Sequence, residues 1–259
     1  MIKIIVCSVT LFLTTFLCFS EESLELLTSE YQPFSGVKGN TMWCEIINTA
    51  FAREGVTVTW KEYPIERAKY LVSAGTNAAI LAGTLVVKEE EKSSFTINDD
   101  PLIYLSVVAF YQGAKFPSGL GIKSPSDLVG KTVGVISGTG SVAILQKANI
   151  KIDPAVDGKT LMNKLVSGRY DVAMVGDLTG LGSLNEVAPD RAGDYKYDQV
   201  YRSPIDLIFS KKFPGSSEIR NKYNLGISKI KSDGTFLKIL KKYYPGGSIN
   251  SSILPKGLQ

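Results

Sequence analysis

The sequence predicts an α/β protein built as two similar lobes that are joined by two strands. Strand and helix patterns alternate in residues 24–82, and the same alternation returns in residues 131–176, which is typical of parallel sheets covered by helices. Two segments of the series are also similar in sequence: "LVSAGTNAAIL" and "LVSGRYDVAMV" both run from a helix end through glycine into a buried strand. Long apolar segments, "LIYLSVVAFY" and "IDLIFS", follow the two series.

Each element follows from local periodicity. Apolar residues recur at helical spacing from Trp43 to Phe51, and glycine follows where that helix would end, at Gly55. Alternating or continuous apolar runs predict the strands. The first series is a strand at 24–28, a helix at 43–51, a strand at 56–60, a helix from 65 closed by Gly75, and a strand at 78–82. The second is a strand at 131–137, a helix at 141–148, a short strand at 150–152, a helix at 158–168, and a strand at 170–176.

The two apolar segments predict how the lobes are connected. If they cross between the lobes in opposite directions, the C-terminal helices return to the first lobe. Lobe 1 then comprises residues 21–109 and 206–259, and lobe 2 comprises residues 110–205. A two-strand hinge of this kind lets a cleft close round a ligand, driven by contacts that exist only in the closed state.

Composition excludes several classes of function. The chain of 259 residues has no histidine, which rules out Ser-His-Asp triads, Cys-His pairs and zinc sites that contain histidine. We therefore predict no catalytic residue, no metal site and no cofactor, although enzymes built on Asp, Glu, Lys or Tyr stay open. The net charge of +4 is spread along the chain, so nucleic-acid binding is disfavoured.

The first 20 residues predict a cleavable secretory signal, because Lys3 precedes an apolar run that ends in "SEES". Lipidation at Cys18 is the less favoured alternative, since Thr15, Phe16 and Leu17 lack the small residue that lipidation usually requires. Removal of the signal leaves Cys44 as the one cysteine, so the exported chain has no internal disulfide. The expected location is the periplasm.

The stretch "GVISGTGSVAILQKA" predicts a strand, a turn with free backbone N–H groups and a helix, which together can hold an anion. It lacks the lysine of a P-loop, and Ala143 stands where a dinucleotide fingerprint needs its third glycine. A carboxylate is therefore the better candidate than a nucleotide phosphate.

Several segments resemble the small exported solute-binding proteins that feed ABC-type amino-acid importers, solute-binding protein family 3. The segments are "YQPF", "SDLVGKTVGVISGTGS", "LVSGRYDVAMVGD", "SPIDLIFSKKFP" and "LGISKIKSDGTFLKILKKYY". The resemblance is to the glutamine-binding branch at the Ser-Gly-Thr-Gly-Ser loop. It implies the type II periplasmic-binding-protein fold, a monomer, a small polar ligand such as an amino acid or related amine, and an ABC permease as partner.

The resemblance also implies ligand-binding residues. Tyr31 would lie against the ligand, although loop packing is an equal alternative. The N–H and hydroxyl groups of Thr139, Gly140 and Ser141 would hold a ligand carboxylate at a helix N-terminus, where ordinary capping by Thr139 or Ser141 is the alternative.

Two further residues complete the predicted site. Asp177 would take the ligand's ammonium group, with helix N-capping as the alternative, and Thr84 would offer a hydroxyl from the first lobe. Asp171 is predicted to be structural.

One position departs from the family pattern. The family's first lobe supplies an arginine that clamps the ligand carboxylate, but in "AGTLVVKEEEKSSFT" the position falls on Glu89 or Glu90. Lys88, Lys92 or Arg67 could supply a charge, without the same planar geometry for the two lysines. We therefore expect a ligand that carries positive charge on the side facing lobe 1, or that lacks a free carboxylate there.

Two other functions stay open. An exported, dehydratase-like enzyme could use the same scaffold, with Glu89, Glu90 or Asp177 as acid or base. A ligand-sensing module for a receptor is the other alternative. Turnover distinguishes the enzyme, because a binding protein returns its ligand unchanged.

Overall fold

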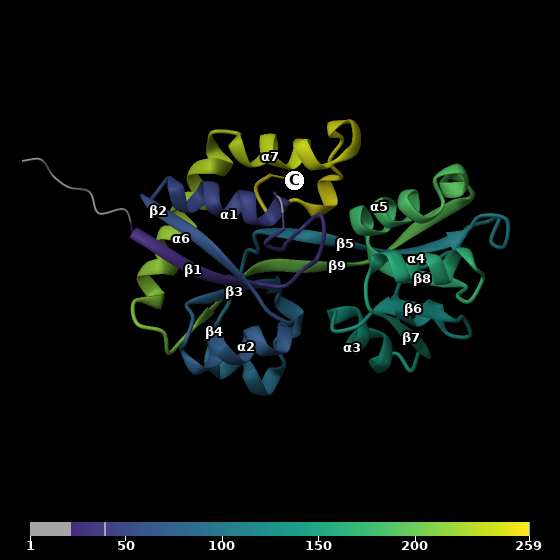
Figure 1. Cartoon of the computed structure of the whole chain (residues 1–259), viewed down its shortest axis with the longest axis horizontal. Coiled ribbons are helices and arrows are strands. Elements are labelled where there is room, and N and C mark those ends of the chain that lie inside the picture. The colour runs from purple at the N-terminus through teal and green to yellow at the C-terminus, as the bar shows by residue number, and fades with distance from the viewer. Residues whose placement is uncertain (1–21, 39, 259) are drawn as a thin grey trace, which may run out of the picture.

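The computed structural model describes residues 22–38 and 40–258. The predicted signal at residues 1–20, including Cys18, lies outside the described residues. Two lobes lie side by side, and two long strands run from one to the other (Figure 1). Lobe 1 carries the purple, blue and yellow parts of the chain, and lobe 2 carries the teal and green middle part.

One sheet runs through both lobes. Nine strands of the described residues form it, in the order β2-β1-β3-β9-β5-β8-β6-β7, with β4 on β9. β1 pairs in parallel with β2 and β3, and β6 pairs in parallel with β7 and β8, as the alternation of strands and helices predicted. The strands are β1 (Glu22–Thr28), β2 (Val56–Glu62), β3 (Ala79–Gly83), β4 (Phe95–Thr96), β5 (Ile103–Gln112), β6 (Val133–Ile136), β7 (Ile152–Ala155), β8 (Val172–Gly176) and β9 (Tyr195–Ser210).

Helices cover the sheet on both lobes. Lobe 1 has α1 (Met42–Ala52), α2 (Ile65–Ala74), α6 (Ser216–Ser232) and α7 (Thr235–Tyr243), and lobe 2 has α3 (Gly140–Lys147), α4 (Gly158–Val166) and α5 (Asp177–Val187). Short 3-10 helices span Thr84–Val86, Glu89–Ser94, Pro125–Leu128, Pro189–Asp194, Pro245–Gly247 and Ser251–Ile253. The apolar face of α1 is buried as predicted, and Gly75 ends α2 with a positive φ of 84°, a conformation that glycine adopts without strain.

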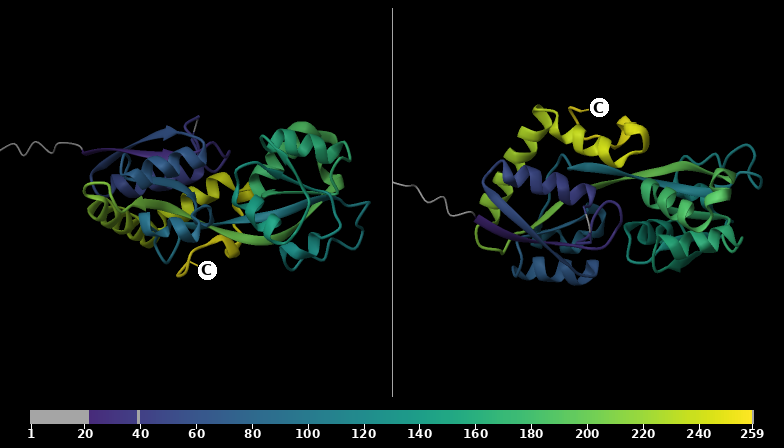
Figure 2. Two further views of the ribbon diagram at one scale, coloured as in Figure 1. Left: turned by 90° about the horizontal axis from the view of Figure 1, so that it is seen from below. Right: turned by 45° about the horizontal axis from the view of Figure 1, so that its top comes forward.

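β5 and β9 are the crossing strands that the two apolar segments predicted. They are antiparallel, and their register shifts between Val107 and Val108. After β9 the chain returns to lobe 1, where α6 and α7 pack beside α1 (Figure 2). Gly226 in α6 permits this close approach, because a Cβ atom there would lie 2.0 Å from the Ala50 carbonyl oxygen of α1.

Lobe 2 differs from prediction at its edge strand. The sequence predicted a strand at 150–152, but β7 begins at Ile152 and includes Pro154. The reason lies in the end of α3: Asn149 has a positive φ of 56°, and the Ile150 N–H donates to the Leu145 carbonyl oxygen. Ile150 thus belongs to the helix C-terminus, where its buried side chain covers the last turn.

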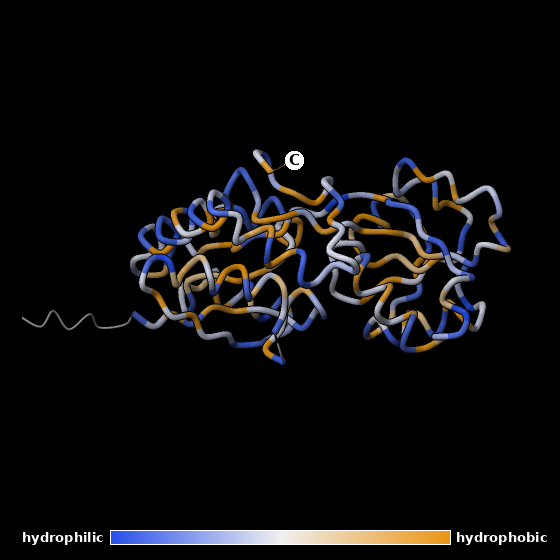
Figure 3. Tube along the Cα trace, turned by 90° about the horizontal axis from the view of Figure 1, so that it is seen from above, coloured by the Kyte–Doolittle hydropathy of each residue, from blue (hydrophilic) through white to orange (hydrophobic). Residues whose placement is uncertain are grey.

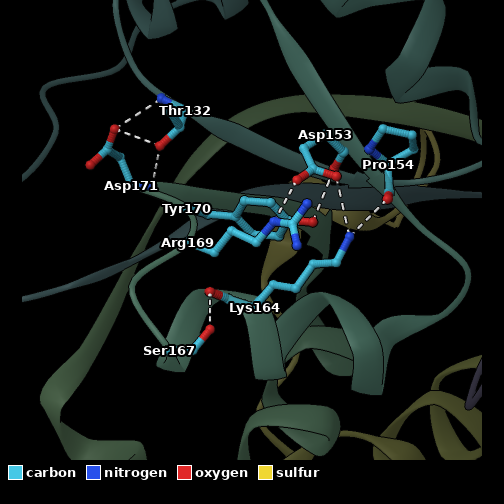
Figure 4. A network of polar contacts seen from close by, with 8 residues as sticks. All are labelled: Thr132, Asp153, Pro154, Lys164, Ser167, Arg169, Tyr170 and Asp171. Atoms are coloured by element: carbon cyan, nitrogen blue, oxygen red, sulfur yellow. Dashed lines mark hydrogen bonds and ion pairs between the residues drawn. The ribbon is translucent and has the colours of Figure 1, made fainter.

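Asp171 has the structural role that the sequence predicted. Its carboxylate accepts hydrogen bonds from the N–H and hydroxyl of Thr132, at 2.9 and 2.7 Å, and its own N–H donates to the Thr132 hydroxyl (Figure 4). Nearby, Lys164 and Arg169 form ion pairs with Asp153, which fix the end of α4 to β7. These contacts brace lobe 2 at its surface.

Hydrophobic stretches lie along the strands inside both lobes, while hydrophilic ones gather in peripheral helices and turns (Figure 3). Among the described residues, none of the helices is both long enough and apolar enough to cross a membrane. The burial of apolar side chains between strands and helices stabilises each lobe.

Candidate functional site

A cavity of about 560 Å³ lies where the lobes meet. Lobe 1, the crossing strands and lobe 2 all contribute to its wall. The volume suits a small molecule. Its polar, charged and aromatic lining consists of Ser29, Glu30, Tyr31, Ser35, Trp43, Glu62, Tyr63, Glu66, Ser137, Thr139, Ser141, Tyr201 and Ser203.

The lobe 2 wall is the loop from β6 into α3. Thr139, Gly140 and Ser141, which the family resemblance assigns to the ligand, all line the cavity. The first N–H groups of α3 have no acceptor within the helix, so the positive end of the helix borders the cavity. Thr139 occupies the N-cap position, yet its hydroxyl donates back to the Ile136 carbonyl oxygen at 2.8 Å and makes no capping bond.

Ser141 connects this loop to a crossing strand. Its hydroxyl lies 2.9 Å from the hydroxyl of Tyr201 on β9, so the two groups share a hydrogen bond. Burial raises the pKa of Tyr201, which keeps that phenol protonated. Both groups line the cavity and can also bond to a ligand.

Tyr31 lines the cavity from the loop after β1. Its ring stacks on Phe34, with centroids 5.5 Å apart, and lies 6.4 Å from the ring of Trp43. Its hydroxyl accepts the Gly176 N–H of lobe 2 at 3.0 Å. Burial raises the pKa of Tyr31 to about 12, against the opposing effect of that hydrogen bond. The structure therefore places Tyr31 both against the cavity and in a contact between the lobes.

The lobe 1 wall carries three carboxylates. Glu30 follows β1, Glu62 ends β2, and Glu66 lies in the first turn of α2. The carboxyl ends of adjacent parallel strands meet at one edge of the sheet, which explains why these positions come together. Among the described residues, the charged side chains that line the cavity are all acidic.

Thr84 and Asp177 are not part of the cavity lining. Thr84 begins a short 3-10 helix. Its two neighbours in the chain, Gly83 and Leu85, do line the cavity. Asp177 is the first residue of α5, where its carboxylate accepts the Leu178 N–H at 2.8 Å. Burial raises the pKa of Asp177 to about 6.

The segment that replaces the family's arginine lies outside the cavity lining as well. Glu89 and Glu90 are exposed residues of the 3-10 helix Glu89–Ser94. Glu91 in the same turn pairs with Lys69 of α2 at 2.9 Å. Lys88, Lys92 and Arg67 also do not line the cavity, and the Arg67 guanidinium lies over the Tyr63 ring, 5.1 Å from its centroid.

Sequence reasoning missed Glu30, Glu62, Glu66, Trp43 and Tyr201. A usable signal existed for the first two, because each stands at or just beyond the carboxyl end of a predicted parallel strand. Trp43 and Tyr201 gave no such signal, since both fit an apolar helix or strand pattern. Their place in the wall depends on how the lobes meet.

Comparisons with known proteins place the fold. No protein-family model matches the chain. A solved ancestral arginine-binding protein bound to arginine is 24% identical, covers 86% of this chain and 98% of its own, and superposes with a TM-score of 0.66. The substrate-binding protein of an amino acid ABC transporter is 21% identical, with 86% and 99% covered and a TM-score of 0.64.

A third solved structure is a histidine kinase sensor domain with similarity to periplasmic binding proteins. It is 12% identical, with 86% of this chain and 96% of that chain covered and a TM-score of 0.69. Sequence identities of 12%, 21% and 24% establish a shared fold and nothing more. With its two lobes, its two crossing strands and its parallel sheets, the chain has the type II periplasmic-binding-protein fold.

Proposed function

We propose that this chain is an exported solute-binding protein of family 3, which captures a small polar ligand, an amino acid or related amine, between its lobes and delivers it to an ABC importer in the periplasm. The observation that carries the proposal is the cavity to which both lobes contribute polar groups. A ligand there gains its full set of contacts only when the lobes meet, so ligand binding drives closure.

The hinge in this proposal lies in β5 and β9. The predicted boundaries at 109/110 and 205/206 stay predictions. β8 already pairs with β5 from Val107 onward, and β3 pairs with β9 from Ile205 onward. The strand segments between these pairings pair with each other and can bend together. The register shift at Val107 and Val108 falls at this point. Closure by hinge bending follows from this placement.

Apolar side chains at the mouth of the cavity suit closure. Leu85 of lobe 1 is 50% exposed and Val156 of lobe 2 is 79% exposed, although both line the cavity. Across the mouth, a Cβ atom on Gly140 would lie 3.9 Å from the Leu85 Cβ. Closing the lobes further would remove apolar surface from water and favour the ligand-bound form.

In the proposed site, Tyr31, Thr139, Gly140 and Ser141 contact the ligand directly. The helix N-terminus behind Thr139 supplies N–H donors for an anionic or carbonyl group. Thr84 and Asp177 stay predicted ligand residues, which the variants Thr84→Val and Asp177→Asn test.

The test is a thermal-shift and calorimetric screen of residues 21–259 against amino acids, amines and organic acids. A ligand at about 100 times its Kd adds about 2.7 kcal/mol to the free energy of unfolding. We expect one equivalent bound and recovered unchanged, with binding weakened by Ser141→Ala and Thr139→Ala. Ser73→Ala, which removes a helical hydroxyl that does not line the cavity, is the matched control.

Thr84→Val and Asp177→Asn in the same assay decide whether these two residues belong to the site. Loss of affinity assigns them to it, and unchanged affinity removes them. Chemical conversion of the ligand would favour the enzyme alternative. Failure of every compound to bind would contradict the proposed function.

The likeness to a sensor domain favours a receptor module as the second candidate. The two are separated by reconstitution with a candidate permease in membranes. Stimulation of its ATPase by the ligand-loaded protein supports import, whereas stimulation of a membrane kinase supports sensing.

A further inference from the structure

We propose, on the basis of the function proposed above, that the ligand is an organic cation whose ammonium or guanidinium group lies against Glu30, Glu62 and Glu66. The shared chemistry is a positively charged nitrogen with hydrogen-bond donors. A basic amino acid and a diamine both provide it.

The first argument is the sign of the charge around the cavity. Glu30, Glu62 and Glu66 line it from the loop after β1, from β2 and from α2, and no Lys or Arg of the described residues joins them. A ligand carboxylate on this side would meet like charges, whereas an ammonium group would meet opposite ones. The wall thus selects cationic groups by attraction and rejects carboxylates by repulsion.

The second argument is that the protein's own cations match this charge only in part. Lys38 lies 3.6 Å from Glu30, but both side chains are well exposed, and such pairs are weak. Lys69 lies nearer to Glu91, at 2.9 Å, than to Glu66, at 3.2 Å. Glu62 has no ion pair among the described residues and accepts only the Val37 N–H, at 3.2 Å.

The third argument is independent of the carboxylates. Trp43 lines the cavity and is 3% exposed. Trp43 also forms an aromatic group with Tyr31 and Phe34 at the same wall, and aromatic faces attract cations.

The opposite wall separates the two sources of the cation. The α3 N-terminus at Gly140 and Ser141 favours negative charge. A basic amino acid would place its carboxylate there and its distant cation on the lobe 1 wall. A diamine would use the lobe 1 wall alone.

The experiment compares affinities by calorimetry for arginine, lysine, ornithine, putrescine, glutamine and glutamate. We expect a cationic compound to bind at least about 100-fold more tightly than glutamine or glutamate. Glu62→Gln should weaken its binding about 10-fold or more, because a charge-assisted contact becomes a neutral one. Glu218→Gln, on the exposed surface of α6, is the control and should change Kd less than about twofold.

The panel also identifies the source of the cation. Binding of arginine, lysine or ornithine without putrescine assigns a basic amino acid, and equal binding of putrescine assigns a diamine. Preference for glutamine or glutamate, with affinity kept in Glu62→Gln, overturns the inference but leaves the proposed function standing. Failure of all six compounds overturns it as well.

Glu62 lies partly buried, so circular dichroism must show that Glu62→Gln folds. Glu66→Gln provides the second variant, because its side chain is 73% exposed and Lys69 keeps its closer partner, Glu91. Weaker binding of the cation by Glu66→Gln supports the inference. Unchanged binding by both folded variants contradicts it.

Discussion

The Tyr31 hydroxyl accepts a hydrogen bond from the Gly176 N–H at 3.0 Å, which ties the loop after β1 in lobe 1 to the end of β8 in lobe 2. A second bond reinforces this tie, since the Thr179 hydroxyl donates to the Gln32 carbonyl oxygen at 2.6 Å. The lobes therefore touch at the loop before α1.

Tyr31→Phe should loosen this contact, because it leaves the Gly176 N–H without its acceptor. A typical hydrogen bond contributes about 0.5–1.5 kcal/mol, so ligand affinity should fall about 2- to 13-fold if closure depends on it. Small-angle scattering should show a larger radius of gyration for the unliganded variant. Tyr197→Phe, on the surface of lobe 2, is the control.

Gly176→Ala tests the same contact from the other lobe. An added Cβ atom would lie 2.8 Å from the Tyr31 hydroxyl oxygen and 3.0 Å from Leu105 Cδ1. The ring of Tyr31 must then move, so this variant should resemble Tyr31→Phe in scattering and in affinity. Wild-type behaviour in both variants would show that this hydrogen bond does not control closure.

Lys69→Met should destabilise lobe 1. The Lys69 side chain is 3% exposed, and its ammonium group donates to the Val86 carbonyl oxygen and to Glu91, both at 2.9 Å. Its removal leaves these acceptors without their cation. We expect a loss of about 1–3 kcal/mol in urea unfolding, below the value for a fully buried pair because Glu91 reaches solvent.

Lys92→Met is the control for this variant. Lys92 pairs with Glu89 at 2.6 Å, but both side chains are exposed, and such a pair contributes about 0–1 kcal/mol. Equal losses in the two variants would contradict the distinct role of Lys69.

Asp206 should make stability depend on pH. It is fully buried on β9, and burial raises its pKa to about 7, although Tyr223, Leu207 and Asn98 donate hydrogen bonds to it. The folded state therefore holds this proton more tightly than the unfolded state, whose pKa is about 3.9. The contribution of Asp206 is greatest below pH 4, falls as the pH rises to 7, and is constant above 7.

Asp206→Asn should remove this dependence. The wild-type free energy of unfolding, minus that of the variant, should fall by up to about 1.4 kcal/mol per pH unit between pH 5 and 7. Denaturant unfolding at pH 5, 6, 7 and 8 measures it. Asp177, whose pKa is raised to about 6, contributes with the same sign in the lower part of this range, so Asp177→Asn is the comparison.

Gly226→Ala should disrupt the packing of α6 on α1, since a Cβ atom there would lie 2.0 Å from a backbone oxygen, that of Ala50. Backbone cannot move aside like a flexible side chain, so we expect a loss of about 3 kcal/mol or more. Gly182→Ala in α5 has no atom within 4 Å of its new Cβ and should raise stability by about 0.5–1 kcal/mol. Thermal unfolding compares them, and similar effects would contradict the packing argument.

The sequence predicted the elements well because their signals are local. Apolar periodicity and a following glycine marked α1 and α2, and alternation marked the parallel strands. The edge strand β7 was misplaced because Ile150 completes a helix C-terminus, which an apolar "IKI" run does not reveal.

The candidate site was less predictable, because it depends on side-chain directions between separate elements. The loop at Thr139 and Ser141 has a compact sequence signal and does line the cavity. Glu66 lies in a helical turn that looks like ordinary surface, whereas Glu89 and Glu90, at the position of the family's arginine, lie outside the cavity lining. The sequence predicted a glutamate at the family's arginine position, whereas the acidic residues that line the cavity are Glu30, Glu62 and Glu66.

The course of the chain through β5 and β9 also sets the order in which the two lobes can fold during synthesis. Lobe 2 lies between the two crossings, so its strands become available together during synthesis. Lobe 1 is made from both ends of the chain: β3 can pair with β1 early, but its other edge finds β9 only when residues 205–209 arrive. The first part of a nascent chain thus carries an unpaired strand edge until most of the protein has been made, and lobe 2 is the part that can fold first.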